Sequence, residues 1–210
     1  MSDIFDSCIK EMPLVAVLRG ITPYEAIPVA DALITAGFKI LEVTLNSPDP
    51  FNSIKQLVNH CSPDILIGAG TVLDAVETDQ LAAIGAKLVI TPNTDTDVIK
   101  RAVHNNLIPV IGCMTPTEAL LAIKTGARAI KVFPATHVGA TFLKDISAVL
   151  PKGAQIIPTG GITIENLEEF YKAGATGAGL GSNLYKAGRP ASEIFTIATE
   201  LVDEWKRISL

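Results

Sequence analysis

The feature that most constrains the fold is a strict alternation of short apolar runs with longer segments of helical character. The apolar runs recur at intervals of roughly twenty to twenty-seven residues. Eight such runs are present, at Leu14–Leu18, Ile40–Leu45, Ile65–Ile67, Leu88–Ile90, Ile108–Ile111, Ala129–Phe133, Gln155–Ile157 and Gly177–Leu180. Because they are apolar throughout rather than at every second position, they are typical of parallel strands buried on both faces.

The segments between these runs carry signals for the beginning and end of helices. Polar capping residues, several followed by proline, predict helix starts near Thr22-Pro23, Ser47-Pro48, Asp74, Asp95-Thr96, Thr115-Pro116 and Thr163. Glycines that can adopt the left-handed conformation predict helix ends at Gly37, Gly85, Gly126 and Gly174. Each glycine is followed shortly by the next apolar run.

Eight strand and helix units in 210 residues predict an α/β fold, a (β/α)8 TIM barrel. The alternative is an open doubly wound sheet, but the first strand-to-helix turn, Leu18–Thr22, lacks the glycine fingerprint of a dinucleotide fold. No linker or change of composition divides the chain. We therefore expect a single barrel domain over residues 1–210.

Composition excludes several classes of function. A net charge of -5 without a cluster of basic residues argues against nucleic acid as a partner. No apolar stretch is long enough for a membrane span or a signal core, so we expect a cytoplasmic protein without a membrane partner. The cysteines are Cys8, Cys61 and Cys113, and the histidines are His60, His104 and His137. The cysteines lack a CxxC pair and the histidines are scattered, which predicts reduced thiols and no metal site.

The most informative single residue is Lys131, which interrupts the apolar run Ala129–Phe133. Burial disfavours the charged form of an amine, so Lys131 could be a neutral nucleophile that forms a Schiff base with a ketone. The alternatives are a structural ion pair with a carboxylate and a buried stem whose charged end reaches water. The segment by itself does not separate these interpretations.

Two further charged residues lie near the carboxyl ends of predicted strands, where barrel active sites are built. Arg19 closes the first strand and Glu42 lies within the second. Burial would raise the pKa of Glu42 toward a value useful for proton transfer. An amine and a carboxylate at one end of a barrel make a plausible nucleophile and acid/base pair, although they could also neutralise each other as an ion pair.

Glycine-rich turns follow the seventh and eighth predicted strands. They contain Gly160 and Gly161 in the first turn and Gly181 and Ser182 in the second. Backbone amides in such turns bind anions, and phosphate sites in barrels often follow strands seven and eight. We therefore predict a phosphorylated substrate. Thr71, after the glycines that follow the third strand, is either a pocket hydroxyl or a helix cap.

Six motifs together resemble the class I aldolases that act on 2-keto-3-deoxy-6-phospho sugar acids and on 4-hydroxy-2-oxoglutarate. The resemblance covers nearly the whole chain. Its motifs are Val17–Gly20, Leu41–Leu45, Gly68–Val72, Ile130–Ala135, Pro158–Gly161 and Gly179–Ser182.

The resemblance implies a homotrimeric barrel enzyme that needs no cofactor and no metal. It implies an imine between Lys131 and the keto carbon, with Glu42 moving protons through a water. By the same resemblance Arg19 and Thr71 hold the pyruvate-like end, Phe133 and Pro92 line the pocket, and Gly160, Gly161, Gly181 and Ser182 bind phosphate. The products would be pyruvate and glyceraldehyde 3-phosphate.

The substrate epimer is where the motifs divide. Asn46–Pro50 resembles the phosphogalactonate branch, whereas Thr159 resembles the phosphogluconate branch. A hydrogen-bonding Thr159 could select one hydroxyl configuration. We expect the 6-phosphogalactonate form to be preferred. The alternatives are a 4-hydroxy-2-oxoglutarate aldolase, a non-covalent phosphate-binding isomerase or synthase, and a non-catalytic sensor of a phosphorylated metabolite.

Overall fold

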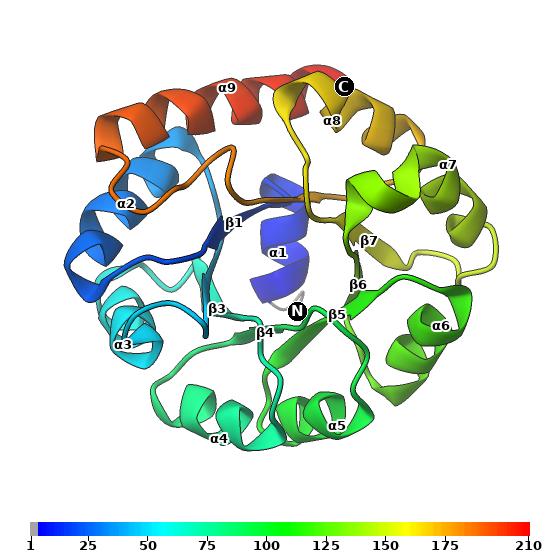
Figure 1. Cartoon of the computed structure of the whole chain (residues 1–210), viewed down its shortest axis with the longest axis horizontal. Helices are drawn as coiled ribbons and strands as arrows, with labels where there is room; N and C mark the ends of the chain where they lie inside the picture. The colour runs from blue at the N-terminus through cyan, green and yellow to red at the C-terminus, as the bar shows by residue number, and fades with distance from the viewer. Residues whose placement is uncertain (1–3) are drawn as a thin grey trace.

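A computed structural model describes residues 4–210 and shows eight strands alternating with helices around a central axis (Figure 1). The elements in chain order are α1 (Ile4–Glu11), β1 (Leu14–Leu18), α2 (Pro23–Ala36), β2 (Ile40–Thr44), α3 (Pro50–His60), β3 (Leu66–Gly70), α4 (Ala75–Ala83), β4 (Leu88–Ile90), α5 (Thr96–His104), β5 (Ile108–Cys113), α6 (Pro116–Thr125), β6 (Ala129–Val132), α7 (Ala135–Ser147), β7 (Gln155–Pro158), α8 (Ile164–Lys172), β8 (Ala178–Leu180) and α9 (Ala191–Ser209).

The strands form one parallel sheet whose order is β7-β6-β5-β4-β3-β2-β1-β8. The first strand, β1, pairs with the last strand, β8. A single bridge between Thr159 and Gly179 then links β7 to β8, so that the sheet forms a nearly closed barrel. The predicted (β/α)8 TIM barrel is confirmed, and the open doubly wound sheet is wrong.

The barrel interior is packed at its amino-terminal end by apolar side chains. Inward residues of successive strands form one cluster, which contains Val15, Ile40, Leu66, Leu88, Ile90, Val110, Ala129 and Ile157. Helix α1 closes this end and adds Phe5 and Cys8 to the same cluster, and Figure 1 shows it in the middle of the ring of strands. Sequence analysis did not predict α1. Helix α1 closes the amino-terminal end of the barrel with apolar side chains, so a ligand can enter only at the opposite end.

A second and larger apolar cluster lies between the sheet and the surrounding helices. Most of the predicted helix starts are confirmed. Asp74 accepts a hydrogen bond from the Val76 amide, and Asp95 accepts one from the Asp97 amide. Thr115 directly precedes α6 and accepts one from the Glu118 amide. Among residues 4–210, every helix is too short or too polar to cross a lipid bilayer.

Two predicted boundaries are wrong. The third strand runs from Leu66 to Gly70 and therefore includes the glycines that the sequence placed after the strand. The third helix begins at Pro50 rather than near Ser47. The Ser47 hydroxyl instead lies 2.9 Å from the Gly20 amide, from which it accepts a hydrogen bond, and 3.0 Å from the Thr44 hydroxyl. Ser47 therefore joins the β1–α2 loop to the end of β2.

Candidate active site

Lys131 and Glu42 both lie inside the barrel. In a strand, residues two apart face the same side, so Lys131 shares the inward face of Ala129 and Glu42 shares that of Ile40. Lys131 is 5% exposed and Glu42 is 1% exposed. Both therefore stand above the apolar floor, toward the carboxyl ends of their strands, as the sequence predicted.

Burial shifts the pKa of each group toward its uncharged form. Burial lowers the pKa of Lys131 below that of an ordinary lysine, and the positive charge of Arg19 lowers it further, whereas the negative charge of Glu42 opposes the shift. Burial likewise raises the pKa of Glu42, against the positive charges of Lys131 and Arg19. The three side chains thus form one electrostatic cluster, and desolvation dominates at both buried members.

The aromatic ring of Phe133 lies beside this cluster. The Lys131 Nζ atom is 5.1 Å from the centre of the ring, a distance at which an aromatic face attracts a cation. Phe133 also lines the cavity described below. The ring therefore connects the buried amine to the open part of the barrel mouth.

Gly70 provides the space that the Glu42 carboxylate occupies. A Cβ atom placed on Gly70 would lie 1.7 Å from Glu42 Oε2, which is far inside contact distance. Oε2 is buried and has no hydrogen-bond partner in the described part of the chain. An unsatisfied buried carboxylate oxygen is costly, and such groups are concentrated at functional sites.

A methyl group at position 70 is expected to displace the Glu42 carboxylate. We predict that Gly70→Ala lowers kcat by about 100-fold, since a displacement of about 1 Å in a catalytic group has an effect of this order. Steady-state cleavage assays on folded protein would measure it. Gly177→Ala is the matched control, because its Cβ would collide with the Pro13 carbonyl oxygen at 2.4 Å, away from Glu42. Equal losses in the two variants would contradict the interpretation.

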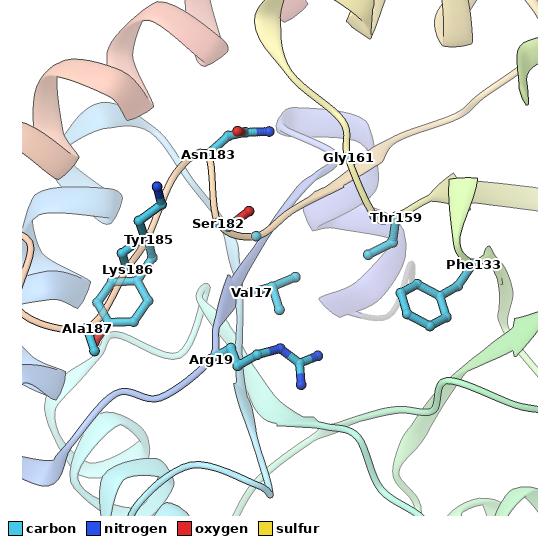
Figure 2. A pocket seen from close by; sticks show the side chains of 12 residues that line it. Val17, Arg19, Phe133, Thr159, Gly161, Ser182, Asn183, Tyr185, Lys186 and Ala187 are labelled. Carbon is cyan, nitrogen blue, oxygen red and sulfur yellow. The ribbon is translucent and has the colours of Figure 1, made fainter. Parts of the chain in front are cut away.

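A cavity of about 650 Å³ opens at the carboxyl ends of the strands. Seven of the predicted site residues line it, and they are Arg19, Phe133, Thr159, Gly160, Gly161, Gly181 and Ser182. Figure 2 shows the Arg19 guanidinium extended toward the side of the cavity where Phe133 and Thr159 lie. The predicted phosphate turns therefore share one cavity with Arg19 and Phe133, two of the residues predicted for the keto-acid end.

The glycine turns of this cavity have backbones that favour anion binding. Gly160 and Gly161 both have positive φ values, 98° and 77°, which an L-residue adopts only with strain. Backbone amides in a glycine turn of this kind can bind an anion. Ser182 is exposed beside them and can add a hydroxyl. This end of the cavity is therefore suited to a phosphate group.

Five residues of the cavity lining were not among the predicted site residues, although the motifs include Val17 and the phosphogalactonate resemblance includes Asn183–Tyr185; the five are Val17, Asn183, Tyr185, Lys186 and Ala187. Four of them belong to the loop after β8. The sequence predicted the glycine turn after the eighth strand. How far the following loop folds back over the barrel mouth depends on contacts with the first βα unit. No periodicity or motif within the loop could show that.

The other predicted residues lie around this cavity rather than on its wall. Lys131 and Glu42 lie deeper in the barrel, and Asn46 is exposed in the β2–α3 loop. Thr71 is a non-glycine residue with a φ of 56°, a strained conformation at the end of β3. The Pro92 carbonyl carbon would lie 2.2 Å from a Cβ on Gly112, the residue paired with Lys131, so the Pro92 backbone packs against the neighbouring strand.

No group of three or more His, Cys, Asp or Glu side chains is arranged to hold a metal within residues 4–210. The three cysteines are free thiols, and burial raises the pKa of Cys113 to about 12. The site brings a buried amine, a buried carboxylate and two glycine turns to the carboxyl ends of the strands. Fold and site together define a (β/α)8-barrel enzyme for a small anionic substrate.

Comparison with known proteins identifies the family. Residues 5–197 match the family described as "Aldolase: KDPG and KHG aldolase", where KDPG is 2-keto-3-deoxy-6-phosphogluconate and KHG is 4-hydroxy-2-oxoglutarate. The chain is 43% identical over 196 residues to the 2-dehydro-3-deoxy-6-phosphogalactonate aldolase of Escherichia coli K12, covering 93% of this chain and 96% of that one. The chain belongs to the KDPG and KHG aldolase family.

Solved structures agree with this assignment. A structure described as native KDPGal is 42% identical, with a TM-score of 0.93 and coverage of 95% of this chain and 97% of that chain. KDPG aldolase of Legionella pneumophila, solved with pyruvate captured as a covalent carbinolamine, is 28% identical with a TM-score of 0.83, covering 96% of this chain and 97% of that one. The protein is thus a class I aldolase.

Proposed function

We propose that this protein cleaves 2-keto-3-deoxy-6-phosphogalactonate to pyruvate and glyceraldehyde 3-phosphate through a Schiff base on Lys131. The observation that carries the proposal is the buried lysine with a lowered pKa, placed inside a barrel whose cavity extends to two glycine turns. The preference for the galactonate form is supported by the identity of 43% with the E. coli phosphogalactonate aldolase, against 28% with the Legionella KDPG aldolase.

In the first half of the reaction the neutral Lys131 amine attacks the keto carbon of the substrate. The resulting carbinolamine takes up a proton, from Glu42 or from solvent, and loses water, which leaves a protonated imine. This imine withdraws electrons from the neighbouring carbon. Burial of Lys131 supports the step because it increases the fraction of amine that is uncharged at neutral pH.

In the second half Glu42 moves the protons. The substrate hydroxyl at C4 gives up its proton, the C3–C4 bond breaks, and glyceraldehyde 3-phosphate leaves while an enamine of pyruvate stays on Lys131. Protonation of the enamine at C3 and hydrolysis of the imine release pyruvate and restore the amine. The unpartnered Oε2 atom of Glu42 is available to accept a proton, directly or through a water.

The remaining candidate residues would bind the two ends of the substrate. Arg19 and Thr71 would hold the pyruvate carboxylate, and Phe133 and Pro92 would form the apolar wall beside the imine. At the other end the amides of the two glycine turns and the Ser182 hydroxyl would hold the phosphate. Arg19 and both glycine turns line the same cavity, which supports a substrate that is anionic at both ends.

Thr159 is the residue that we expect to influence the choice of epimer. It lies on the cavity wall, and its hydroxyl has only a 3.4 Å contact with the Ile157 carbonyl, so it can turn toward a substrate hydroxyl. We predict that Thr159→Val lowers the ratio of kcat/KM for the phosphogluconate epimer to that for the phosphogalactonate epimer by about tenfold or more. Thr159→Ser, which keeps the hydroxyl, is the control. An unchanged ratio in the valine variant would remove Thr159 from the specificity assignment.

Steady-state comparison of the two phosphorylated epimers and of 4-hydroxy-2-oxoglutarate tests the substrate proposal. We expect the highest kcat/KM for the phosphogalactonate form and the lowest for the unphosphorylated acid. A higher value for 4-hydroxy-2-oxoglutarate would favour that alternative activity. The homotrimer implied by the sequence resemblance stays a prediction, which sedimentation equilibrium can test.

A further inference from the structure

One wall of the cavity is built from a segment without regular secondary structure. It is the loop of residues 181–190 between β8 and α9, here called the β8 loop, and it contributes Ser182, Tyr185, Lys186 and Ala187 to the lining. Figure 2 places Tyr185, Lys186 and Ala187 on the side of the cavity opposite Phe133 and Thr159. A loop without a backbone ladder depends on side-chain contacts for its shape.

The side chain of Glu25 makes such contacts from the first turn of α2. Its Oε1 atom accepts a hydrogen bond from the Gly188 amide at 2.8 Å and lies 3.5 Å from the Tyr185 hydroxyl. Its Oε2 atom accepts hydrogen bonds from the Thr22 amide at 3.1 Å and from the Thr22 hydroxyl at 2.7 Å. One carboxylate therefore joins the β8 loop to the β1–α2 turn, across the pairing of β1 with β8.

These contacts exceed what capping of a helix requires. Glu118 has the corresponding position in the first turn of α6, and it accepts a hydrogen bond from the Met114 amide, four residues earlier. Glu25 provides the same kind of local cap and in addition reaches a loop 163 residues away. Burial raises the pKa of Glu25, but the hydrogen bonds from Thr22 and Gly188 lower it by more, so the carboxylate is charged at neutral pH.

We propose that Glu25 is a positioning residue that holds the β8 loop in the shape that receives the substrate phosphate. The inference rests on the proposed function, in which phosphate binds between the glycine turns and Ser182. Glu25 acts on the affinity for the phosphorylated end, because Gly188 and Tyr185 belong to the loop that carries Ser182. Lys131 lies on β6, whereas the hydrogen bonds of Glu25 go to Thr22, Tyr185 and Gly188, so we expect the chemistry at Lys131 not to depend on them.

The test compares three variants in two assays. Glu25→Ala removes all four contacts, Glu25→Gln keeps one oxygen that can accept from the Gly188 amide, and Glu118→Ala removes a purely local cap. For Glu25→Ala we expect KM for the phosphorylated substrate to rise about tenfold with kcat within about twofold of the parent. The glutamine variant should recover most of the loss, and Glu118→Ala should show none.

The second assay measures borohydride trapping of pyruvate on the enzyme, which does not involve the phosphate site. All three variants should require the same pyruvate concentration as the parent for half-maximal trapping. The proposal is overturned if KM is unchanged in Glu25→Ala, if Glu118→Ala loses as much, or if pyruvate trapping falls in parallel. A parent enzyme that traps no pyruvate would instead contradict the aldolase mechanism, and calorimetric binding of inorganic phosphate to the parent and to Glu25→Ala would still decide the role of Glu25.

Discussion

Replacement of Lys131 by alanine is expected to lower kcat for aldol cleavage by at least about 10,000-fold, since removal of a covalent nucleophile has effects of this order. Lys131 is 5% exposed inside the barrel, and no other lysine is among the predicted site residues. The same variant should form no adduct when pyruvate is reduced on the enzyme with borohydride. Mass spectrometry of the reduced parent should place the adduct on a peptide that contains Lys131.

Two controls separate loss of chemistry from loss of structure. Lys131→Met keeps the length and apolar volume of the side chain, so it should fold like the parent, as circular dichroism and the thermal midpoint would report. Lys144→Ala removes an exposed lysine of α7 and should keep full activity. A pyruvate adduct that persists in Lys131→Ala would refute the Schiff-base assignment.

The pH dependence of trapping follows from the same environment. Only the uncharged amine attacks pyruvate, so the trapping rate should rise as pH increases through the pKa of Lys131. Because burial lowers that pKa, the midpoint should lie below the value of about 10.4 found for free lysine. A midpoint at or above the free value would indicate that the amine reaches water.

Replacement of Glu42 by glutamine is expected to lower kcat by about 1,000-fold, since proton transfer by a positioned side chain contributes effects of about 100- to 10,000-fold. Glutamine is nearly isosteric but cannot take up or release the proton. Imine formation with pyruvate should remain detectable by borohydride trapping. The variant thus separates carbon–carbon cleavage from the formation of the Schiff base.

In the parent enzyme, kcat should also fall at low pH as the Glu42 carboxylate becomes protonated. Burial raises the pKa of this carboxyl above the ordinary glutamate value of about 4.3. The carboxylate that accepts a proton is therefore lost as pH falls through this raised pKa. This fall at low pH should disappear from the residual activity of Glu42→Gln. Parent-like kcat in that variant would show that another group moves the protons.

Much of the fold could be predicted from the chain because its signals are local. The apolar runs are buried strands, and residues such as Asp74 and Thr115 begin helices through hydrogen bonds to amides two or three residues away. Boundaries failed where a distant contact outweighed the local signal. Ser47 resembles a helix cap, but its hydroxyl accepts a hydrogen bond from Gly20, and α3 begins three residues later.

The same distinction applies to the candidate site. Lys131 and Glu42 were conspicuous because a charge within an apolar strand is unusual, and their position near the carboxyl ends of predicted strands indicated the active-site end of the barrel. The glycines after the third predicted strand indicated either a close approach to the backbone or a simple turn, and only the fold shows that a Cβ atom on Gly70 would overlap Glu42 Oε2. Glu25 looked like an ordinary capping residue, and only the fold brings Gly188 to its carboxylate.

By itself the sequence determined the barrel, the two buried charges and the glycine turns, because these depend on the spacing of residue types along the chain. The tertiary structure decided the shape of the cavity, the unpartnered oxygen of Glu42 and the attachment of the β8 loop to α2. Those features depend on atoms from strands and loops far apart in the chain, whose distances are fixed only when the barrel closes through β1 and β8.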